Sequence, residues 1–415
     1  MTVVRRRSAA ALAAAAAVLC TAAAPAVAAP SPAPKIPAGL YGANDPTYDG
    51  VWRQSLALLA QDTVGVEPAK QAVDWLTGQQ CANGGFASYR ADAAKACDAK
   101  TMLDTNATAA AVQALAALGG HGNEVKKSTA WLKSVQNEDG GWSYNPGGAS
   151  DANSTSVVIG ALAAAGEKPG DVKSKQGKSP YDSLVSFAIP CGGKDGGAFA
   201  YQPDKSGTLY ANADATAAAV LGGLGKGLVI DNPKPLADPV CENAAKPTAE
   251  QAAGNGAAYL AGALAKTGHL MSAMPGAEDQ PDFGNTADAV IALGASLHGD
   301  KAADALRWLE SNSAAWAKEN GPAAYAQLIL AANAIGFDPR SFGGANLVQQ
   351  LNATGPKPAA EAAVTPSPTA AETPDKATEE KKDDNGGLGV GWIIGIGLVA
   401  GIGIGILISG RKKNQ

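Results

Sequence analysis

One arrangement of polar and apolar positions recurs along the central part of the chain. An Asp or Asn stands four residues before a Thr, and an Ala-rich apolar run follows; the four copies begin at Asp104, Asp151, Asn212 and Asp282. Each run ends near a glycine. Asp, Asn and Thr are favoured at helix N-caps, and glycine is favoured just after a helix. The pattern therefore predicts four close-packed helices, starting near residues 108, 155, 216 and 286.

A second, amphipathic helix is predicted to follow in these units, for example at residues 69–80, 124–137 and 301–312. In three units an aromatic residue is followed eight positions later by Asn or Asp and then by Gly-Gly; these aromatic residues are Trp75, Trp131 and Phe187. A fixed offset of this kind indicates an internal repeat.

Two further units, at residues 54–65 and 325–336, and a last helix near residues 341–351 complete the array. Six pairs of alternating close-packed and amphipathic helices predict an all-α fold over residues 40–352. We expect a closed α6/α6 toroid, with an inner barrel of six helices and an outer layer of six. An open solenoid is the alternative, but its end repeats would need polar outer faces, which the sequence does not provide.

The two ends of the chain carry signals of an exported and anchored protein. Residues 1–28 combine three arginines, an Ala-rich apolar run and an Ala-Val-Ala cleavage site, which predicts a signal peptide. A Pro-rich leader (29–39) precedes the toroid, and a flexible stalk rich in Pro, Ala, Thr and charged residues (353–387) follows it. Residues 388–409 are apolar and uncharged, which predicts a transmembrane helix, and residues 410–415 form a basic tail. The expected topology is single-pass type I, with the toroid outside the cell.

Composition removes several classes of function. Charged residues make up 17% of the chain and its net charge is -5, so nothing indicates a nucleic-acid partner. The three histidines lie far from any metal-ligand spacing, so neither a metal nor a cofactor is expected. The four cysteines outside the signal peptide predict disulfides. Three pairings are open, and we favour Cys81 with Cys97 and Cys191 with Cys241, because each closes an insertion beside a helix pair.

The segments Gln136 to Trp142 and Gln80 to Phe86 resemble the glutamine-tryptophan repeat of the prenyltransferase and squalene-cyclase superfamily. The resemblance extends over most of residues 40–352 and implies an α/α toroid, in agreement with the helix count. It also implies a scaffold role for Gln136 and Trp142, with the amide tying a helix end to the stacked ring. The repeat says little about chemistry.

Class II terpene cyclases of this superfamily carry D-x-D-D-T-A at the start of an inner helix, and its middle Asp donates a proton. The copies here keep Asp104 and Asp151 but place Asn106 and Asn153 at the acid position. Only Asp214 matches the proton donor, and the neighbouring acids of the family motif are missing around it. Aromatic residues, which stabilise carbocations, make up only 5% of the chain. The zinc site of the prenyltransferase branch and the thioester motif of complement-type toroids are not matched either.

The helix starts remain as the candidate site. Inner helices of a toroid run parallel, so their first residues gather around one mouth; these are Asp104, Asn106, Asp151, Asn153, Asn212, Asp214 and Asp282. One interpretation is that they are N-caps and nothing more. The other is a binding site for a small molecule, a glycan or a surface protein. Cobalamin carriers share the ring and are similar at Asp104-Thr105 and Thr286 to Asp288, so a corrinoid or other nutrient for a membrane importer is one candidate.

We therefore expect a binder rather than an enzyme. A cyclase using Asp214 is the alternative, and a structural spacer on the cell surface is the third hypothesis. A Pro-rich insertion at residues 233–247 is interpreted as a surface loop held by Cys241, with a lid over one mouth as the alternative.

Overall fold

The computed structural model describes residues 36–231, 236–273 and 280–361. The predicted signal peptide, most of the leader and the stalk, the predicted transmembrane helix and the basic tail lie outside these residues. Among the described helices, none combines the length and the apolar character that a membrane crossing needs.

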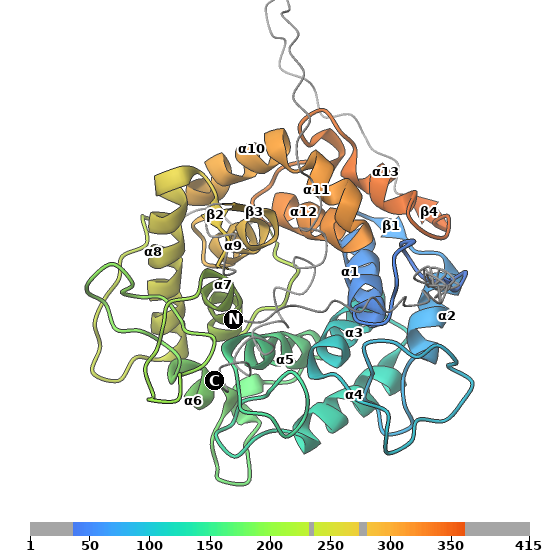
Figure 1. The fold of residues 1–415 in the computed structure, drawn as a ribbon, viewed down its shortest axis with the longest axis horizontal. Coiled ribbons are helices and arrows are strands. Elements are labelled where there is room, and N and C mark those ends of the chain that lie inside the picture. Colours follow the sequence, from blue (N-terminus) through green and yellow to red (C-terminus); the bar gives the residue numbers. More distant parts are fainter. Residues whose placement is uncertain (1–35, 232–235, 274–279, 362–415) are drawn as a thin grey trace, which may run out of the picture. The chain divides into compact units, whose positions relative to one another are not determined.

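Six helices form the inner barrel: α1 (Gly50–Thr63), α3 (Thr105–Leu118), α5 (Ala152–Ala164), α7 (Ala213–Gly223), α9 (Phe283–Ala295) and α12 (Pro322–Ala334). Each inner helix contacts the next, and α12 contacts α1, so the barrel closes (Figure 1). Six helices form the outer layer: α2 (Lys70–Gly78), α4 (Gly122–Ser134), α6 (Pro180–Val185), α8 (Ala249–Thr267), α10 (Ala303–Asn312) and α13 (Leu347–Asn352). The predicted all-α, α6/α6 toroid is therefore confirmed, and closure rules out the open solenoid.

A few short elements complete the ring. Helix α11 (Ala314–Asn320) lies between α10 and α12, and three single-turn 3₁₀ helices span Pro169–Asp171, Gly299–Ala302 and Pro339–Ser341. Strand β1 (Val66–Glu67) pairs antiparallel with β4 (Ala360–Glu361), and β2 (Leu270–Met271) pairs antiparallel with β3 (Pro281–Asp282). The first pair joins the segment after α1 to the last described residues of the chain.

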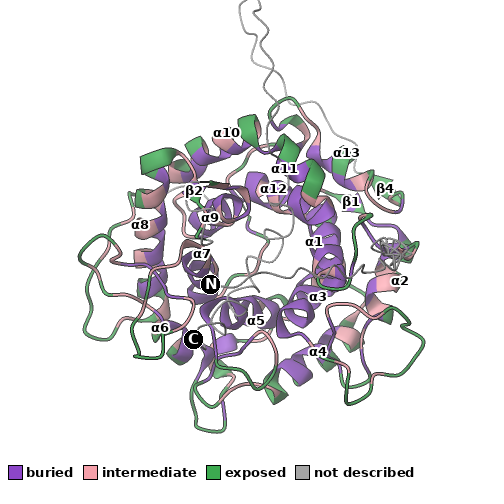
Figure 2. Ribbon diagram, viewed as in Figure 1, coloured by how far each residue is buried: buried purple, intermediate pink, exposed green. Residues whose placement is uncertain are grey.

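The hydrophobic core lies between the two helix layers and inside the barrel. The inner helices are buried around most of their circumference, whereas the outer helices have one buried and one exposed face (Figure 2). Alanine dominates the inner helices, as in TNATAAAVQALAAL of α3. Small side chains let neighbouring helices approach closely, and apolar burial stabilises each helix by roughly 25 cal/mol per Å².

Each inner helix from α3 to α9 begins three residues before the predicted start, for example at Thr105 and Ala152. The Asp or Asn of the repeat is the N-cap, and its side chain accepts a hydrogen bond from a backbone N–H three residues later. The Thr lies in the first turn and has another task. Its Oγ1 accepts from the backbone N–H of the preceding segment, as Thr155 does from Trp142 at 3.1 Å and Thr108 from Phe86 at 2.9 Å. In each repeat the Asp or Asn thus caps the inner helix, and the Thr links the first turn of that helix to the preceding turn by a hydrogen bond.

The two glutamines of the resemblance have structural roles that differ. Gln80 Nε2 donates to the backbone oxygen of Glu124 and to Ser128 Oγ, both at 2.8 Å, so it ties its turn to α4. Gln136 Nε2 instead donates to Gly140 O of its own turn at 2.7 Å. Trp142 is fully buried.

Both predicted disulfides are present. Cys81 pairs with Cys97 and Cys191 with Cys241, with Cα–Cα distances of 5.6 and 5.8 Å. Disulfides form and persist in oxidising compartments, so they indicate an environment outside the cytoplasm.

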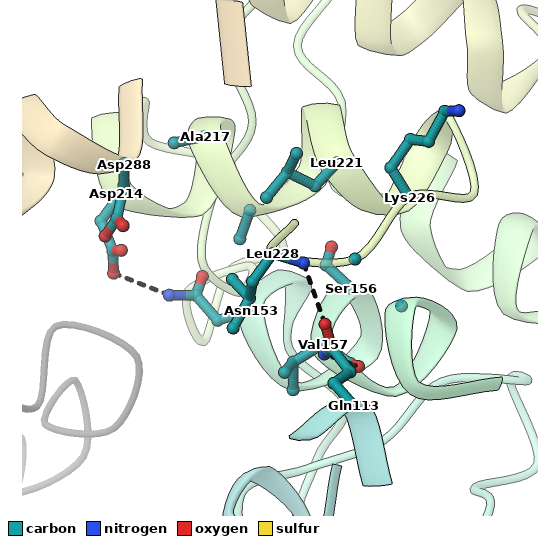
Figure 3. A pocket seen from close by; sticks show the side chains of 13 residues that line it. Gln113, Asn153, Ser156, Val157, Asp214, Ala217, Leu221, Lys226, Leu228 and Asp288 are labelled. Atoms are coloured by element: carbon teal, nitrogen blue, oxygen red, sulfur yellow. Dashed lines mark hydrogen bonds between the residues drawn. The ribbon is translucent and has the colours of Figure 1, made fainter. Parts of the chain in front are cut away.

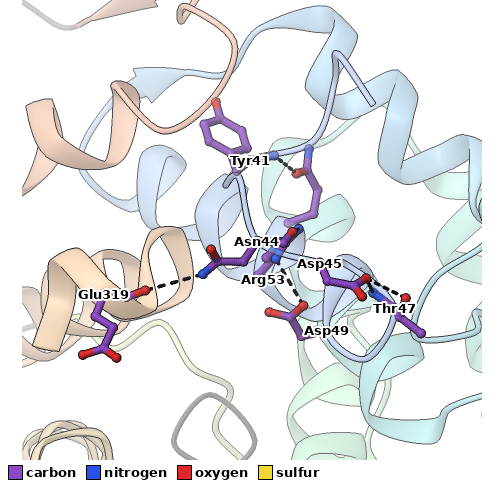
Figure 4. Close-up of polar contacts among 8 residues, drawn as sticks. Tyr41, Asn44, Asp45, Thr47, Asp49, Arg53 and Glu319 are labelled. Carbon is purple, nitrogen blue, oxygen red and sulfur yellow. Dashed lines mark hydrogen bonds and ion pairs between the residues drawn. The ribbon is translucent and has the colours of Figure 1, made fainter. Parts of the chain in front are cut away.

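The first and last repeats meet at a polar seam (Figure 4). Arg53 of α1 stands where α3, α5, α7 and α9 have Thr, and it is buried. Its guanidinium contacts Asp49 at 3.3 Å and donates to the backbone oxygen of Asn44 at 2.9 Å. Asn44 in turn donates to the backbone oxygen of Glu319 at 3.4 Å. Through Asn44, Arg53 thereby links the segment before α1 to Glu319 of α11, near the last inner helix.

Candidate functional site

A small cavity, part of it open to solvent, lies inside the inner barrel between α3, α5, α7 and α9 (Figure 3), and a water-sized molecule can occupy about 30 Å³ of it. Polar and charged side chains line it together with aliphatic ones. The lining residues are Gln113, Asn153, Ser156, Val157, Gly160, Asp214, Ala217, Ala218, Leu221, Lys226, Gly227, Leu228 and Asp288.

The segment after α7 forms the floor of the cavity. Leu228 N donates to Gln113 Oε1 of α3 at 2.9 Å, and Asn333 Nδ2 of α12 donates to Ile230 O at 3.0 Å. Gly160 and Gly227 permit this crossing, since a Cβ on Gly227 would lie 2.5 Å from Gln113 Oε1. Residues 225–230 therefore cross the barrel near the carboxyl ends of its helices. They precede the predicted insertion at 233–247, part of which lies outside the described residues.

Two carboxyl groups from neighbouring repeats form the acidic end of the cavity. Asp214 of α7 and Asp288 of α9 lie side by side (Figure 3). Asn153 Nδ2 of α5 donates to Asp214 Oδ2 at 2.7 Å, and Gln327 Nε2 of α12 donates to Asp288 Oδ1 at 2.7 Å. The two amides leave both carboxyl groups oriented and hydrogen-bonded.

The environment favours the neutral forms of both acids. Burial, followed by the charge of Asp288, raises the pKa of Asp214 well above its usual range. Burial raises the pKa of Asp288 to about 7, although the hydrogen bond from Gln327 opposes the shift. Two adjacent carboxylates repel each other when both are ionised. Near neutral pH the pair therefore retains a proton.

The seven predicted site residues separate into two groups. Asp104, Asp151, Asn212 and Asp282 are N-caps whose side chains turn back to the amides of their own helices. The side chain two positions further on lies about 200° around the helix and so faces another direction. In this way Asn153 and Asp214 line the cavity, whereas Asn106 is buried but not among the lining residues. The structure thus brings together only part of the predicted ring.

Sequence reasoning missed the role of Asp288. It stands six residues after its N-cap, Asp282, whereas Asp214 stands two residues after Asn212, so a comparison of equivalent repeat positions does not pair them. The expectation that Asp214 lacks an acidic neighbour is wrong, because the neighbouring repeat supplies one. The second and the sixth residue after an N-cap are four residues apart, so they lie on the same face of a helix. This spacing was the signal in the sequence that could have related Asp288 to Asp214. Gln327, six residues after Gly321 in the last repeat, occupies the position equivalent to Asp288.

The buried acids predict that the fold loses stability as pH rises. Asp151, with a pKa of about 6, Asp288, with a pKa of about 7, and Asp214 all have raised values in the folded state. A carboxyl whose pKa is higher folded than unfolded stabilises the fold at low pH, and that stability disappears as pH rises through the folded pKa. We expect the free energy of unfolding to fall by on the order of 4 kcal/mol between pH 5 and pH 8. The charged and polar groups around the Asp214–Asp288 pair are Asp151 and Asn153 of the α5 start, Asp282 of the α9 start and Gln327 of α12.

Urea denaturation across this pH range measures the effect, and Asp288→Asn provides the control. The amide cannot ionise but can still accept from Gln327, so the variant should show a clearly flatter pH profile. Equal profiles for both proteins would show that Asp288 does not titrate with the expected shift.

Within the described ranges, no group of three or more His, Cys, Asp or Glu side chains is placed to hold a metal ion.

Comparison with known proteins addresses the fold. A family model described as the prenyltransferase alpha-alpha toroid domain matches residues 51–223. No curated protein matches the chain. Among solved structures, ent-copalyl diphosphate synthase from Streptomyces platensis aligns with a TM-score of 0.45 at 16% identity, covering 69% of this chain and 50% of that one. A protein from Actinoplanes aligns with a TM-score of 0.30 at 16% identity, covering 62% of this chain and 81% of that one. This chain thus spans half the length of the synthase.

Proposed function

We propose that the ring binds a small molecule in its central cavity without catalysis; the match of residues 51–223 to a model of the prenyltransferase alpha-alpha toroid domain supports the fold on which this proposal rests. The ligand enters at the mouth formed by the inner-helix starts and rests on the floor made by residues 225–230. A glycan or a partner protein at the same mouth is an outcome that the experiments below distinguish.

The lining of the cavity carries this proposal. Among the lining residues that the structure describes, none is aromatic, and the walls are aliphatic side chains such as Val157, Ala217 and Leu221. A cavity that guides carbocations relies on aromatic faces to stabilise positive charge along the reaction path. A few oriented polar groups on an aliphatic wall are instead typical of a specific binding pocket.

A thermal-shift screen of the purified full chain against small nutrients, with cyanocobalamin as the corrinoid, tests the proposal. A ligand present at 100 times its dissociation constant should raise the free energy of unfolding by roughly 2.7 kcal/mol. Asp214→Asn should weaken the hit, because Asp214 lines the cavity.

Asp104→Asn is the matched control. It makes the same substitution at the start of an inner helix, but Asp104 is an N-cap outside the cavity lining and Asn caps equally well. A hit that responds equally to both variants, or only to Asp104→Asn, would contradict a site in the cavity. If no compound shifts the transition, the spacer hypothesis is favoured.

A cyclase using Asp214 is the second candidate, and the Asp214–Asp288 pair favours it. A carboxylic acid that stays protonated, oriented by Asn153 and next to a second carboxyl, has the form of a proton donor to an alkene or epoxide. Incubation with squalene or a polyprenyl diphosphate, followed by mass spectrometry, tests this. We expect no cyclised product; a product that disappears in Asp214→Asn would overturn the binding proposal.

The location that we propose follows from the ends of the chain. The predicted signal peptide and the apolar segment at 388–409 place the ring outside the cell on a membrane anchor, and the two disulfides agree with an oxidising compartment. A membrane importer that receives the ligand is the partner that this position suggests. Protease treatment of intact cells should digest the ring; protection of the ring would contradict the topology.

A further inference from the structure

Leu297 has a left-handed backbone conformation at a position where most inner helices are followed by glycine. Directly after the C-cap of α1, α5, α7 and α12 stands a glycine with φ between +64° and +80°; these residues are Gly65, Gly166, Gly225 and Gly336. After α9 this position is Leu297, with a φ of +67°, and among the described residues it is the only non-glycine residue of positive φ. Such strained residues cluster at functional and switch regions, so the turn after α9 is a candidate for a function of its own.

The turn after α9, here called the α9 turn (residues 297–301), holds part of the Pro-rich insertion. The backbone N–H of Leu236 donates to Leu297 O at 2.7 Å. Two residues further along the insertion, Asp238 Oδ1 pairs with Lys301 Nζ at 2.5 Å. One backbone and one side-chain contact therefore attach the insertion to the α9 turn.

His298 stands between the two contact residues of the α9 turn. Its imidazole interacts with the backbone of Ala237, and its Nδ1 is buried without a hydrogen-bond partner among the described residues. Whichever nitrogen carries the proton of the neutral ring, the protonated ring has an N–H at Nδ1. In the attached arrangement this charged donor would be buried without an acceptor, which is unfavourable. The attached arrangement therefore requires the neutral ring.

The charged groups around His298 do not remove this cost. Burial lowers the pKa of His298, although the charges of Asp300 and Asp238 oppose the shift, and the charge of Lys301 lowers the pKa further. Gly299 lies against the apolar side chain of Ile335, at the end of α12. Helices α8, α9 and α10 also contact this turn, and their charged residues are Glu250 and Lys266 of α8, Asp288 of α9, and Asp304, Arg307 and Glu310 of α10. A histidine whose pKa is lower in the attached than in the released segment weakens the attachment as pH falls below its ordinary value of about 6.5.

We propose that the α9 turn is a pH-sensitive latch, which holds residues 236–238 while His298 is neutral and releases them when His298 is protonated. The disulfide between Cys191 and Cys241 holds the chain three residues further on, so the release stays local. The latch does not depend on the proposed binding function, because none of its residues lines the central cavity. It makes the carboxyl end of the barrel responsive to acid.

Hydrogen–deuterium exchange of the purified full chain, followed by mass spectrometry and corrected for the intrinsic exchange rates, tests the latch. Between about pH 7.5 and about pH 5.5, we expect the protection of residues 236–240 to fall about fivefold or more, beginning below about pH 6.5. Peptides of α3 should not lose protection, because the buried acids of the barrel stabilise the fold as pH falls. The opposite response of α3 separates release of the latch from a loss of stability in the whole ring.

His298→Gln assigns the effect to the imidazole. The amide does not take up a proton in this pH range, so the variant should lose the pH dependence of residues 236–240. The matched control is His121→Gln, which makes the same substitution at the N-cap of α4 and should keep the pH dependence. Circular dichroism of both variants confirms folding.

Hydrogen exchange at Cε1 of His298 is a second measurement and needs no variant. Its midpoint in the full chain should lie below the ordinary value of about 6.5. A midpoint at or above that value, unchanged protection of residues 236–240 across the pH range, or equal pH dependence in the wild type and His298→Gln would each overturn the latch.

Discussion

Gly140→Ala is expected to lower the free energy of unfolding by about 3 kcal/mol or more. Gly140 has a φ of +92°, which residues with a Cβ rarely adopt. A Cβ there would also lie 2.2 Å from the backbone oxygen of Ser179. Ser179 is the N-cap of α6 and is held in a capping box with Asp182, so it cannot move without disturbing the start of that helix. Urea denaturation followed by far-ultraviolet circular dichroism measures the loss.

Gly147→Ala is the matched control for the backbone contribution. Gly147 has a nearly identical φ of +89°, but a Cβ there would meet nothing within 4 Å. Only the conformational cost remains, about 1 kcal/mol. Equal losses for the two variants would show that the turn at Gly140 does not pack tightly against α6, contrary to the structure.

Trp142→Ala is expected to cost roughly 4 kcal/mol of stability. The side chain is fully buried, and its Nε1 donates to Leu132 O of α4 at 2.7 Å. The substitution therefore leaves a large cavity and a buried carbonyl without this donor. The backbone of Trp142 also bonds to Asp151 and Thr155 at the start of α5, so movement of the turn would reach the inner barrel.

Two variants define this effect by urea denaturation. Trp142→Phe retains most of the apolar volume and removes only the indole donor, so it should cost about 1–2 kcal/mol. Trp75→Ala, at a half-buried position on an outer helix, should cost clearly less than Trp142→Ala. If Trp142→Ala lowered the free energy of unfolding by less than about 1 kcal/mol, Trp142 would not have the scaffold role that the glutamine-tryptophan repeat implies.

The helices and their order were predictable because the signals for them are local. An N-cap bonds to an amide three residues away, and several of the helices end beside a glycine of positive φ, such as Gly119 after α3. The pairing of the cysteines was also predictable from the sequence, since each disulfide closes an insertion beside a helix pair. The start positions were displaced by three residues because the recurrent Thr was interpreted as the cap, whereas its hydroxyl ties the first turn to the preceding segment.

The sequence by itself therefore determined the all-α repeat, its closure into six pairs and the chemical types at the helix starts. Only the tertiary structure decided which of those residues share a cavity. Asp214 and Asp288 lie side by side because the packing of α7 against α9 brings together two positions that are not equivalent in the repeat, and no local motif sets that packing. The floor made by Leu228 on Gln113 joins residues 115 positions apart in the chain. Such contacts form only when the ring closes, because neither residue carries a signal for the other in its own neighbourhood.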